Sequence, residues 1–485
     1  MKYITAIIII ANSVLFGQSA NQFDEYLGKD WYGIYMQDNK IGCYSMELSK
    51  KTKDRWIAKM EMNMTFMMNQ TKAEMSSSET RIYQGRNAEL AYSKFVNISD
   101  AGSITVEGKK EGDNYNVVID IAGQKTVTNF DCPVETLADV LKIEMLAVEG
   151  KLHVGDRFAI KTFESEPPMT GITNHLTNIE NRQELIFGGV ATDIFVVRDS
   201  LPAIGVTAQL YVDYNGNILK QGFAPLGMVM KSEPEELARQ LDCDYDLLTN
   251  NIIKTENGPE NPAEIYSAVY IISGYDIAQL PASDRLIIDA FSIDSAQITV
   301  NRKVSHQFEL DIPIDNDSLN SYLQAEQLIQ SDNPEIIKLA KAIVGDETNA
   351  FEAAKLINNW VHENIRKEFS PDISNALQTL KAGRGDCGEH SALATALNRA
   401  LGIPSRIIAG VAYWPGGKGF AFHAWIEVYV GEWIQMDPTW GETFADATHI
   451  MLAKGGLIDQ IGPVYNGLMG LKIKIVSCKQ PILSR

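Results

Sequence analysis

Long apolar runs are almost missing from this 485-residue sequence, and the clear exception comes at its start. Lys2 precedes a mainly apolar stretch over residues 4–16, which ends near Gly17 and Ser19. A positive start, a short apolar run and small residues after it are typical of a secretory signal peptide, whereas a membrane-spanning helix needs about 20 apolar residues. We therefore expect residues 1–19 to be a cleaved signal peptide rather than an uncleaved anchor. The mature protein is then exported, periplasmic or extracellular, without stable membrane insertion.

Clusters of Lys and Arg are also missing, and the chain as a whole is acidic. Its 43 basic and 62 acidic residues give a formal net charge of −19. Such a charge repels phosphate backbones, so nucleic acid is excluded as a partner. The hydrophobic fraction of 45% is ordinary for a globular protein, and the length is enough for about three domains with buried cores.

Closely spaced cysteine pairs are the third absence. The five cysteines are Cys43, Cys132, Cys243, Cys387 and Cys478. Zinc sites and disulfide frameworks usually show short Cys spacings, so we predict neither, and no metal or other cofactor. An odd number of cysteines leaves at least one thiol unpaired in an oxidising compartment, and the surroundings of Cys387 mark it as that thiol.

Alternating polar and apolar residues dominate the first half of the chain. Residues 31–231 are rich in short β-type segments, and Asn215-Gly216 between two of them is a strong hairpin signal. One helical stretch interrupts them near residues 134–147. The pattern predicts an antiparallel sheet that curls around a helix.

The residues able to perform covalent chemistry are concentrated in residues 383–441. Asp386 stands three positions before Glu389 and just ahead of an apolar-periodic run, which predicts a capping box and a helix that begins at Cys387. A helix N-terminus favours a thiolate by only about 0.3–1 kcal/mol, so activation of the thiol requires a histidine partner. The Cys387 amide is then a natural donor to an oxyanion.

That partner is predicted on a later strand. His423 begins an alternating stretch, and Asp437 ends the strand that returns after Gly431-Glu432. His423 can take a proton from Cys387, and Asp437 can fix the ring's tautomer. A two-residue turn would place His423 and Asp437 on opposite faces of the hairpin. We therefore predict a longer loop or a bulge there.

Three motifs complete the pattern: Gly-Ile-Pro-Ser-Arg at 402–406, His-Ala-Trp-Ile-Glu at 423–427 and Asp-Pro-Thr at 437–439. Together with the helix-initial cysteine they resemble the core of the transglutaminase-like superfamily. By this resemblance Cys387 is the nucleophile, His423 the general base and acid, and Asp437 the orienting acid. The resemblance also implies a papain-like α+β core.

The resemblance and the β patterning together define the expected fold class: α+β, with an antiparallel β-rich N-terminal region followed by a papain-like transglutaminase core. The expected divisions are a signal peptide at 1–19, a β-rich N-terminal domain at 20–254, a β-rich linker or second β domain at 255–313, and a transglutaminase-like catalytic domain at 314–485.

The expected reaction begins with attack of the thiolate on an amide of a protein or peptide, giving an acyl-enzyme. Water as the next acceptor makes a peptidase or amidase, and an amine makes a transamidating enzyme. We expect hydrolysis, because water is abundant outside the cytoplasm, and transamidation stays open. A second alternative makes the N-terminal β domain the working part, which binds a peptide, glycan or lipid while the core serves as a scaffold.

Three neighbouring residues carry weaker expectations. His390 would complete a metal site with Cys387, His423 and Asp437, although the triad reading fits the strand-end carboxylate better. Gln378 is considered as a second oxyanion donor, and His449 as a residue on the substrate side.

Overall fold

The computed structural model describes residues 22–68, 71–99, 102–121, 123–167, 169–202, 206–223, 227–241, 245–304, 308–368, 375–455, 460, 463–464, 467 and 470–480. The expected signal peptide and Cys243 lie outside these residues. The chain forms two compact units, Met1–Asp246 and Leu247–Arg485. Within the described part of the chain, none of the helices combines the length and apolar character needed to cross a bilayer.

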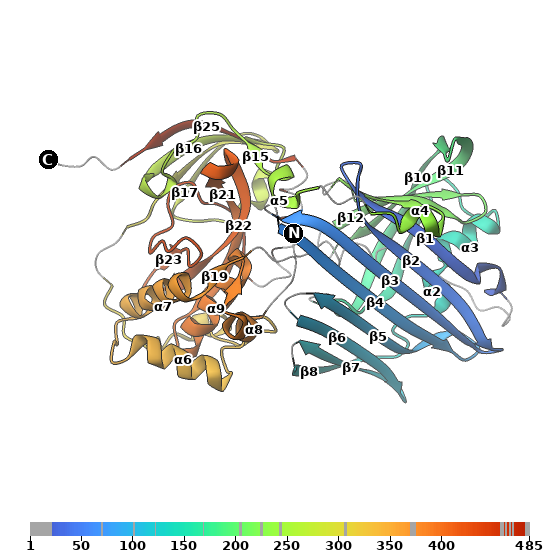
Figure 1. Cartoon of the computed structure of the whole chain (residues 1–485), viewed down its shortest axis with the longest axis horizontal. Coiled ribbons are helices and arrows are strands. Elements are labelled where there is room, and N and C mark those ends of the chain that lie inside the picture. The colour runs from blue at the N-terminus through green and yellow to red at the C-terminus, as the bar shows by residue number, and fades with distance from the viewer. Residues whose placement is uncertain are drawn as a thin grey trace. The chain divides into compact units, whose positions relative to one another are not determined.

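The first unit is built on one 14-stranded antiparallel sheet (Figure 1). Its strands are β1 (Gly28–Met36), β2 (Asn39–Thr52), β3 (Arg55–Met68), β4 (Thr71–Gln84), β5 (Glu89–Ser99), β6 (Gly102–Glu111), β7 (Asn114–Ile121), β8 (Gln124–Asp131), β9 (Arg157–Glu164), β10 (Gly171–Phe187), β11 (Val190–Leu201), β12 (Val206–Asp213), β13 (Ile218–Phe223) and β14 (Met228–Ser232).

The order of these strands follows from two runs of sequential hairpins. Strands β1 to β8 pair with their successors, as do β9 to β14, and β1 joins β14 in the middle. The strands β8 and β9 therefore lie at opposite ends of the sheet. The expected antiparallel N-terminal sheet is confirmed, and so is the hairpin at Asn215-Gly216, which connects β12 to β13.

Short helices cross between the two ends of the sheet. The helix expected near 134–147 is present as α2 (Leu137–Val140) and α3 (Lys142–Val148), and Thr136 and Asp139 form a capping box at the start of α2. The α2 residues pack with Trp56 and Phe163 from the strands in one buried core. This unit also contains η1 (Asp24–Tyr26) and α4 (Glu235–Ala238).

The second unit combines two antiparallel sheets with helices. The five-stranded sheet contains β15 (Ile253–Lys254), β22 (Gly419–Tyr429), β21 (Ser405–Trp414) and β24 (Ile450–Gly455) in that order, and β23 (Trp433–Met436) pairs with β22. The four-stranded sheet has the order β17 (Leu286–Ser292), β18 (Ser295–Asn301), β16 (Ser267–Ser273) and β25 (Lys472–Lys479).

The segment 255–313 does not stand apart from the second unit. Its strands β16 to β18 pair with the C-terminal β25, and their core residues Tyr270 and Ile298 share a cluster with Val411 and Phe420 of the five-stranded sheet. The structure thus divides at 246/247 into two units where the sequence led us to expect three domains after the signal peptide.

Helices cover one face of the five-stranded sheet (Figure 1). Leu393 and Leu397 of the central helix pack against Ile426 and Val428 of β22. Toward the end of β22, alternation therefore directs Ile426 and Val428 to the helices and Trp425 to the opposite side. The helices and remaining short elements are α5 (Leu247–Asn250), η3 (Pro262–Glu264), η4 (Ile277–Gln279), η5 (Asp317–Tyr322), α6 (Pro334–Val344), α7 (Ala350–Asn364), β19 (Arg366–Lys367), α8 (Ala376–Ala382), β20 (Arg384–Gly385), α9 (Cys387–Ala400) and η6 (Pro415–Gly417).

Candidate active site

The start of helix α9 fixes the position of Cys387. The Gly388 amide donates to Asp386 Oδ1 over 2.8 Å, and the Asp386 amide donates to Glu389 Oε2 over 2.9 Å. The Glu389 amide also donates to the Asp386 side chain, which completes the capping box that the sequence predicted, so Glu389 serves as a helix cap. Cys387 is the first residue inside the helix and remains partly exposed, whereas most of α9 behind it is buried. A rigid, buried helix therefore presents an accessible thiol at its N-terminus.

The hairpin of β22 and β23 brings His423 and Asp437 to the same face. Tyr429 pairs with Trp433 and Glu427 with Gln435, which leaves a three-residue loop between the strands. Odd-numbered residues therefore oppose odd-numbered residues. The predicted longer loop is confirmed, and it is the feature that allows the histidine and the carboxylate to meet.

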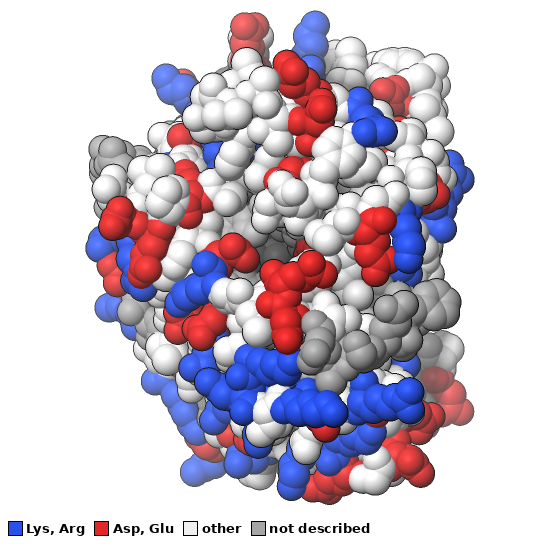
Figure 2. Space-filling view, turned by 90° about the vertical axis from the view of Figure 1, so that its right-hand side faces the viewer, with Lys and Arg blue, Asp and Glu red and all other residues white. Residues whose placement is uncertain are grey.

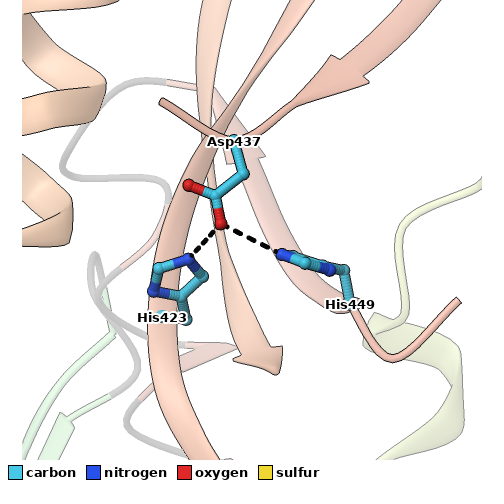
Figure 3. Close-up of side chains that lie close together, drawn as sticks. All are labelled: His423, Asp437 and His449. Carbon is cyan, nitrogen blue, oxygen red and sulfur yellow. Dashed lines mark hydrogen bonds and ion pairs between the residues drawn. The ribbon is translucent and has the colours of Figure 1, made fainter. Parts of the chain in front are cut away.

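Asp437 is a fully buried carboxylate with both oxygens occupied (Figure 3). Its Oδ2 lies 2.8 Å from His423 Nε2, and its Oδ1 accepts the amides of Thr439 and Trp440 at 2.7 and 3.1 Å. Burial raises the pKa of Asp437, but His423 and then His449 outweigh it and hold the pKa well below its usual range. Asp437 therefore stays ionised at any ordinary pH.

The His423 ring connects this carboxylate to the thiol. Burial lowers the pKa of His423, but attraction to Asp437 and a hydrogen bond with Cys387 raise it to about 9. Because Nε2 faces Asp437, Nδ1 is the ring nitrogen left for Cys387, and Figure 3 shows it turned away from the carboxylate. Trp440 stacks on the ring with 4.3 Å between centroids and an interplanar angle of 13°. The structure thus brings Cys387, His423 and Asp437 together.

His449 was considered as a substrate-side residue, and the structure gives it a different position. It is only 1% exposed, and it lies on the far side of Asp437, with Nε2 at 3.2 Å from Oδ2 (Figure 3). Its Nδ1 lies 3.3 Å from Asp446 Oδ1. Burial lowers the pKa of His449, but Asp446 and Asp437 raise it to about 10. His449 is therefore an imidazolium buried between two carboxylates, and a substrate-side role is excluded.

A buried arginine supports the loop that carries His449. Arg285 Nη2 donates to the carbonyls of Ala445 and Asp446 at 2.9 and 2.5 Å, and its Nη1 donates to Gln435. Gln435 also accepts from Trp425 Nε1 over 3.1 Å. These bonds fix the loop from Asp437 to His449 to the β22–β23 hairpin, so the carboxylate has little freedom to turn.

The hydrogen bonds of Gln378 and His390 do not support the roles considered for these two residues. Gln378 Oε1 accepts the Asn375 amide over 3.0 Å in the capping box of α8, so this side chain is already used as a cap and not as an oxyanion donor. Both ring nitrogens of His390 lie on backbone carbonyls, at 2.7 Å from Asp386 and 3.1 Å from Ile365. His390 is therefore not free to join Cys387 in a metal site.

Among the residues that the structure describes, two sets of side chains could in principle hold a metal ion. They are His423, Asp437 and His449, and Glu442, Asp446 and His449. Their ring nitrogens already lie at hydrogen-bonding distance from carboxylate oxygens, and each side chain is at most 9% exposed. The hydrogen-bond network accounts for the clustering of these groups.

A helix-initial cysteine facing a His–Asp pair on neighbouring strands of an antiparallel sheet defines the core of papain-like cysteine enzymes. Within that class, residues 337–438 match the transglutaminase-like superfamily. The second unit therefore contains a transglutaminase-like domain, as the three motifs had indicated.

Comparison with individual proteins gives partial matches. A Haemophilus influenzae protein described as uncharacterized is 33% identical over 100 residues, which are 19% of this chain and 26% of that protein. A solved structure of a proposed cysteine protease from Cytophaga hutchinsonii is 17% identical and covers 45% of this chain and 90% of its own, with a TM-score of 0.33. A proposed protease from Parabacteroides distasonis is 10% identical and covers 76% and 65%, with a TM-score of 0.20. The chain thus spans about a quarter of the curated relative that it matches.

Proposed function

We propose that this protein is an exported cysteine enzyme that hydrolyses amide bonds of a protein or peptide. The observation that carries the proposal is the continuous chain of contacts from the Cys387 thiol through the His423 ring to the buried Asp437 carboxylate. Cys387 is the nucleophile, His423 the general base and acid, and Asp437 the group that orients the ring.

The resting state favours proton transfer from sulfur to nitrogen. With a pKa of about 9, raised by Asp437 and Cys387 against the effect of burial, His423 is protonated at neutral pH. An imidazolium beside the thiol stabilises a thiolate, and the N-terminus of α9 adds a smaller contribution of about 0.3–1 kcal/mol. His423 therefore carries a proton beside the sulfur that it can give to the leaving group.

Two half-reactions follow. The Cys387 thiolate attacks the amide carbon, a carbon–sulfur bond forms, and the oxyanion lies where the Cys387 amide can donate to it. His423 then gives its proton to the leaving amine as the carbon–nitrogen bond breaks. Water next attacks the thioester and loses a proton to His423, and the acid product leaves as the carbon–sulfur bond breaks, which restores the thiolate beside the protonated ring. A primary amine in place of that water would give transamidation, which remains the alternative.

The test is thiol labelling followed by mass spectrometry. Wild type, Cys387→Ala and Cys478→Ala are treated with limiting iodoacetamide at pH 6, where ordinary thiols react slowly because few are ionised. Cys478 is a matched control because it is a free, half-exposed cysteine of the same unit. We expect Cys478→Ala to label like wild type and Cys387→Ala to lose the rapid phase. Equal rapid labelling of Cys387→Ala would overturn the assignment.

The acyl acceptor is tested on the same proteins. Wild type is incubated with a digest of casein, with and without a primary amine. The masses of the products are then measured by mass spectrometry. Hydrolysis yields new peptide termini that the amine leaves unchanged, and an acyl adduct appears on Cys387. Amine-containing products would favour the transamidating alternative. Absence of any adduct or product across varied substrate digests would favour a scaffold role for the core.

A further inference from the structure

The first unit encloses a cavity of about 700 Å³ that the proposed chemistry does not use. It lies between strands β1 to β4, strands β13 and β14, and helix α3. Five tyrosines line it together with methionine and leucine side chains. The tyrosines are Tyr26, Tyr32, Tyr44, Tyr83 and Tyr214. Such a size and mixture of aromatic, apolar and polar walls are typical of sites for small organic ligands.

Two polar side chains in this cavity each have one atom without a protein partner. Glu144 is 8% exposed and Gln221 is 4% exposed. Among the described residues, Glu144 Oε2 and Gln221 Nε2 find no hydrogen-bond partner. A buried polar atom without a partner is destabilising, and more so where the group is charged. Both side chains line the cavity, so both belong to the wall that a bound ligand would contact.

Acidic side chains outnumber basic ones among the described residues that line the cavity. Asp30 and Glu144 both line it, and Arg81 is the only Lys or Arg among the described residues that do. Arg81 is already committed, because its Nε and Nη1 donate to Glu79 and Glu135 at 2.8 and 2.7 Å. Figure 2, which faces the first unit, shows a hollow with acidic side chains around its mouth. The cavity therefore repels anions and has a carboxylate available for a cation.

The ionisation of Glu144 is consistent with a missing positive partner. Burial raises its pKa to about 8, and Asp30 contributes in the same direction against a backbone hydrogen bond that lowers it. An ammonium group beside this carboxylate would compensate both effects. Tyrosine rings add cation–π attraction, which is about 0.5–2 kcal/mol per contact.

We propose that the first unit binds an organic cation in this cavity: a primary amine or ammonium group on an apolar or aromatic body. The ammonium group pairs with Glu144 near Asp30, and the body is buried against Met46, Leu48 and Met60. The Gln221 amide donates to an acceptor on the ligand. This site is independent of the thiol chemistry of the second unit.

The test compares three probes of equal chain length: decylammonium, decanol and decanoate. Each is titrated into the full mature chain at pH 8.5 in a calorimeter. At that pH Glu144 is largely ionised, and a primary amine with a pKa near that of lysine, about 10.4, remains charged. We expect decylammonium to bind at least tenfold more tightly than decanoate. Decanoate binding as tight as decylammonium, or no binding of decylammonium, would overturn the proposal.

Matched variants assign the interaction to the cavity. Glu144→Gln keeps the shape and removes the charge, so decylammonium should lose at least tenfold in affinity while decanol is unchanged. Glu236→Gln is the control, because Glu236 is exposed on α4 and does not line the cavity. Asp30→Asn, at an exposed position, should weaken binding severalfold and tests the proposal even if Glu144→Gln does not fold. Unchanged affinity in a folded Glu144→Gln, or in Asp30→Asn, counts against it.

Discussion

Replacing His449 by Gln tests whether the buried imidazolium stabilises the second unit through its charge. The ring lies between Asp437 and Asp446, at 3.2 and 3.3 Å, and it is almost fully buried. Gln fills a similar volume and can keep one hydrogen bond, but it brings no positive charge. Removing one partner of a buried ion pair costs about 3–5 kcal/mol. The remaining donors to Asp437 reduce the loss, so we expect about 3 kcal/mol at pH 6.

The pH dependence separates charge from packing. Because Asp446 and Asp437 raise the pKa of His449 against the effect of burial, from 6.5 to about 10, its contribution is complete below pH 6.5 and is lost as the pH rises through 10. The difference in unfolding free energy between wild type and His449→Gln should therefore be largest at pH 6. It should shrink steadily toward pH 10.5.

Calorimetric melting of the full chain measures this difference. A loss of 3 kcal/mol in a unit of this size lowers its melting temperature by about 6–12 °C. His362→Gln is the control, because His362 is half-buried in the same unit and contacts only a backbone carbonyl, Thr439 O, through Nδ1 in the hydrogen bonds described. Its effect should be smaller, because the ring does not bridge two carboxylates in the hydrogen bonds described. A destabilisation of His449→Gln that is the same at pH 6 and pH 10.5 would refute the charge argument and leave only a packing role.

Four further predictions concern the site and the export of the protein. Asp437→Asn removes the main cause that raises the pKa of His423 to about 9 against burial, so rapid alkylation of the thiol at pH 6 should be lost; an unchanged labelling profile would contradict the role of the carboxylate. Deleting Gly431 shortens the β22–β23 loop to two residues and turns His423 and Asp437 to opposite faces, so labelling should fall at least tenfold while melting of the first unit is unaffected. Chelation with EDTA should leave labelling unchanged, and elemental analysis that finds stoichiometric metal would support the metal alternative instead. Expressed in a Gram-negative host, the protein should appear in the periplasmic fraction without residues 1–19, and N-terminal sequencing checks the cleavage point.

Local signals in the sequence were sufficient for the parts of the site that depend on neighbours along the chain. The spacing of Asp386 and Glu389 predicted the helix that begins at Cys387, because a capping box is made within one turn. The parity of His423 and Asp437 predicted the longer loop, since side chains alternate with a period of two. A local interaction also explains why Gln378 was considered as an oxyanion donor without success. Its side chain forms a capping box with Asn375 at the start of α8.

Long-range pairings could not be predicted in the same way. Strand β1 pairs with β14, and β16 pairs with β25, across about 200 residues in each case, and alternation alone does not specify a partner. His449 was missed for the same reason. No helix or strand connects His449 to Asp437 in a regular spacing. The loop that brings His449 back to Asp437 is held by Arg285, which directly precedes β17 of the four-stranded sheet.

The position of His449 bears on why the orienting group is a carboxylate. Asp437 Oδ2 lies within hydrogen-bonding distance of two imidazoles, and Oδ1 accepts two backbone amides, so every contact of this side chain is made by a donor. An asparagine at this position would turn its NH₂ group toward either the two rings or the two backbone amides. The nitrogen of that group cannot accept a hydrogen bond from them. Papain-like proteases can carry asparagine as the third residue of the triad. Here the second imidazolium requires a full negative charge between the rings, which in turn keeps His423 protonated beside the thiol.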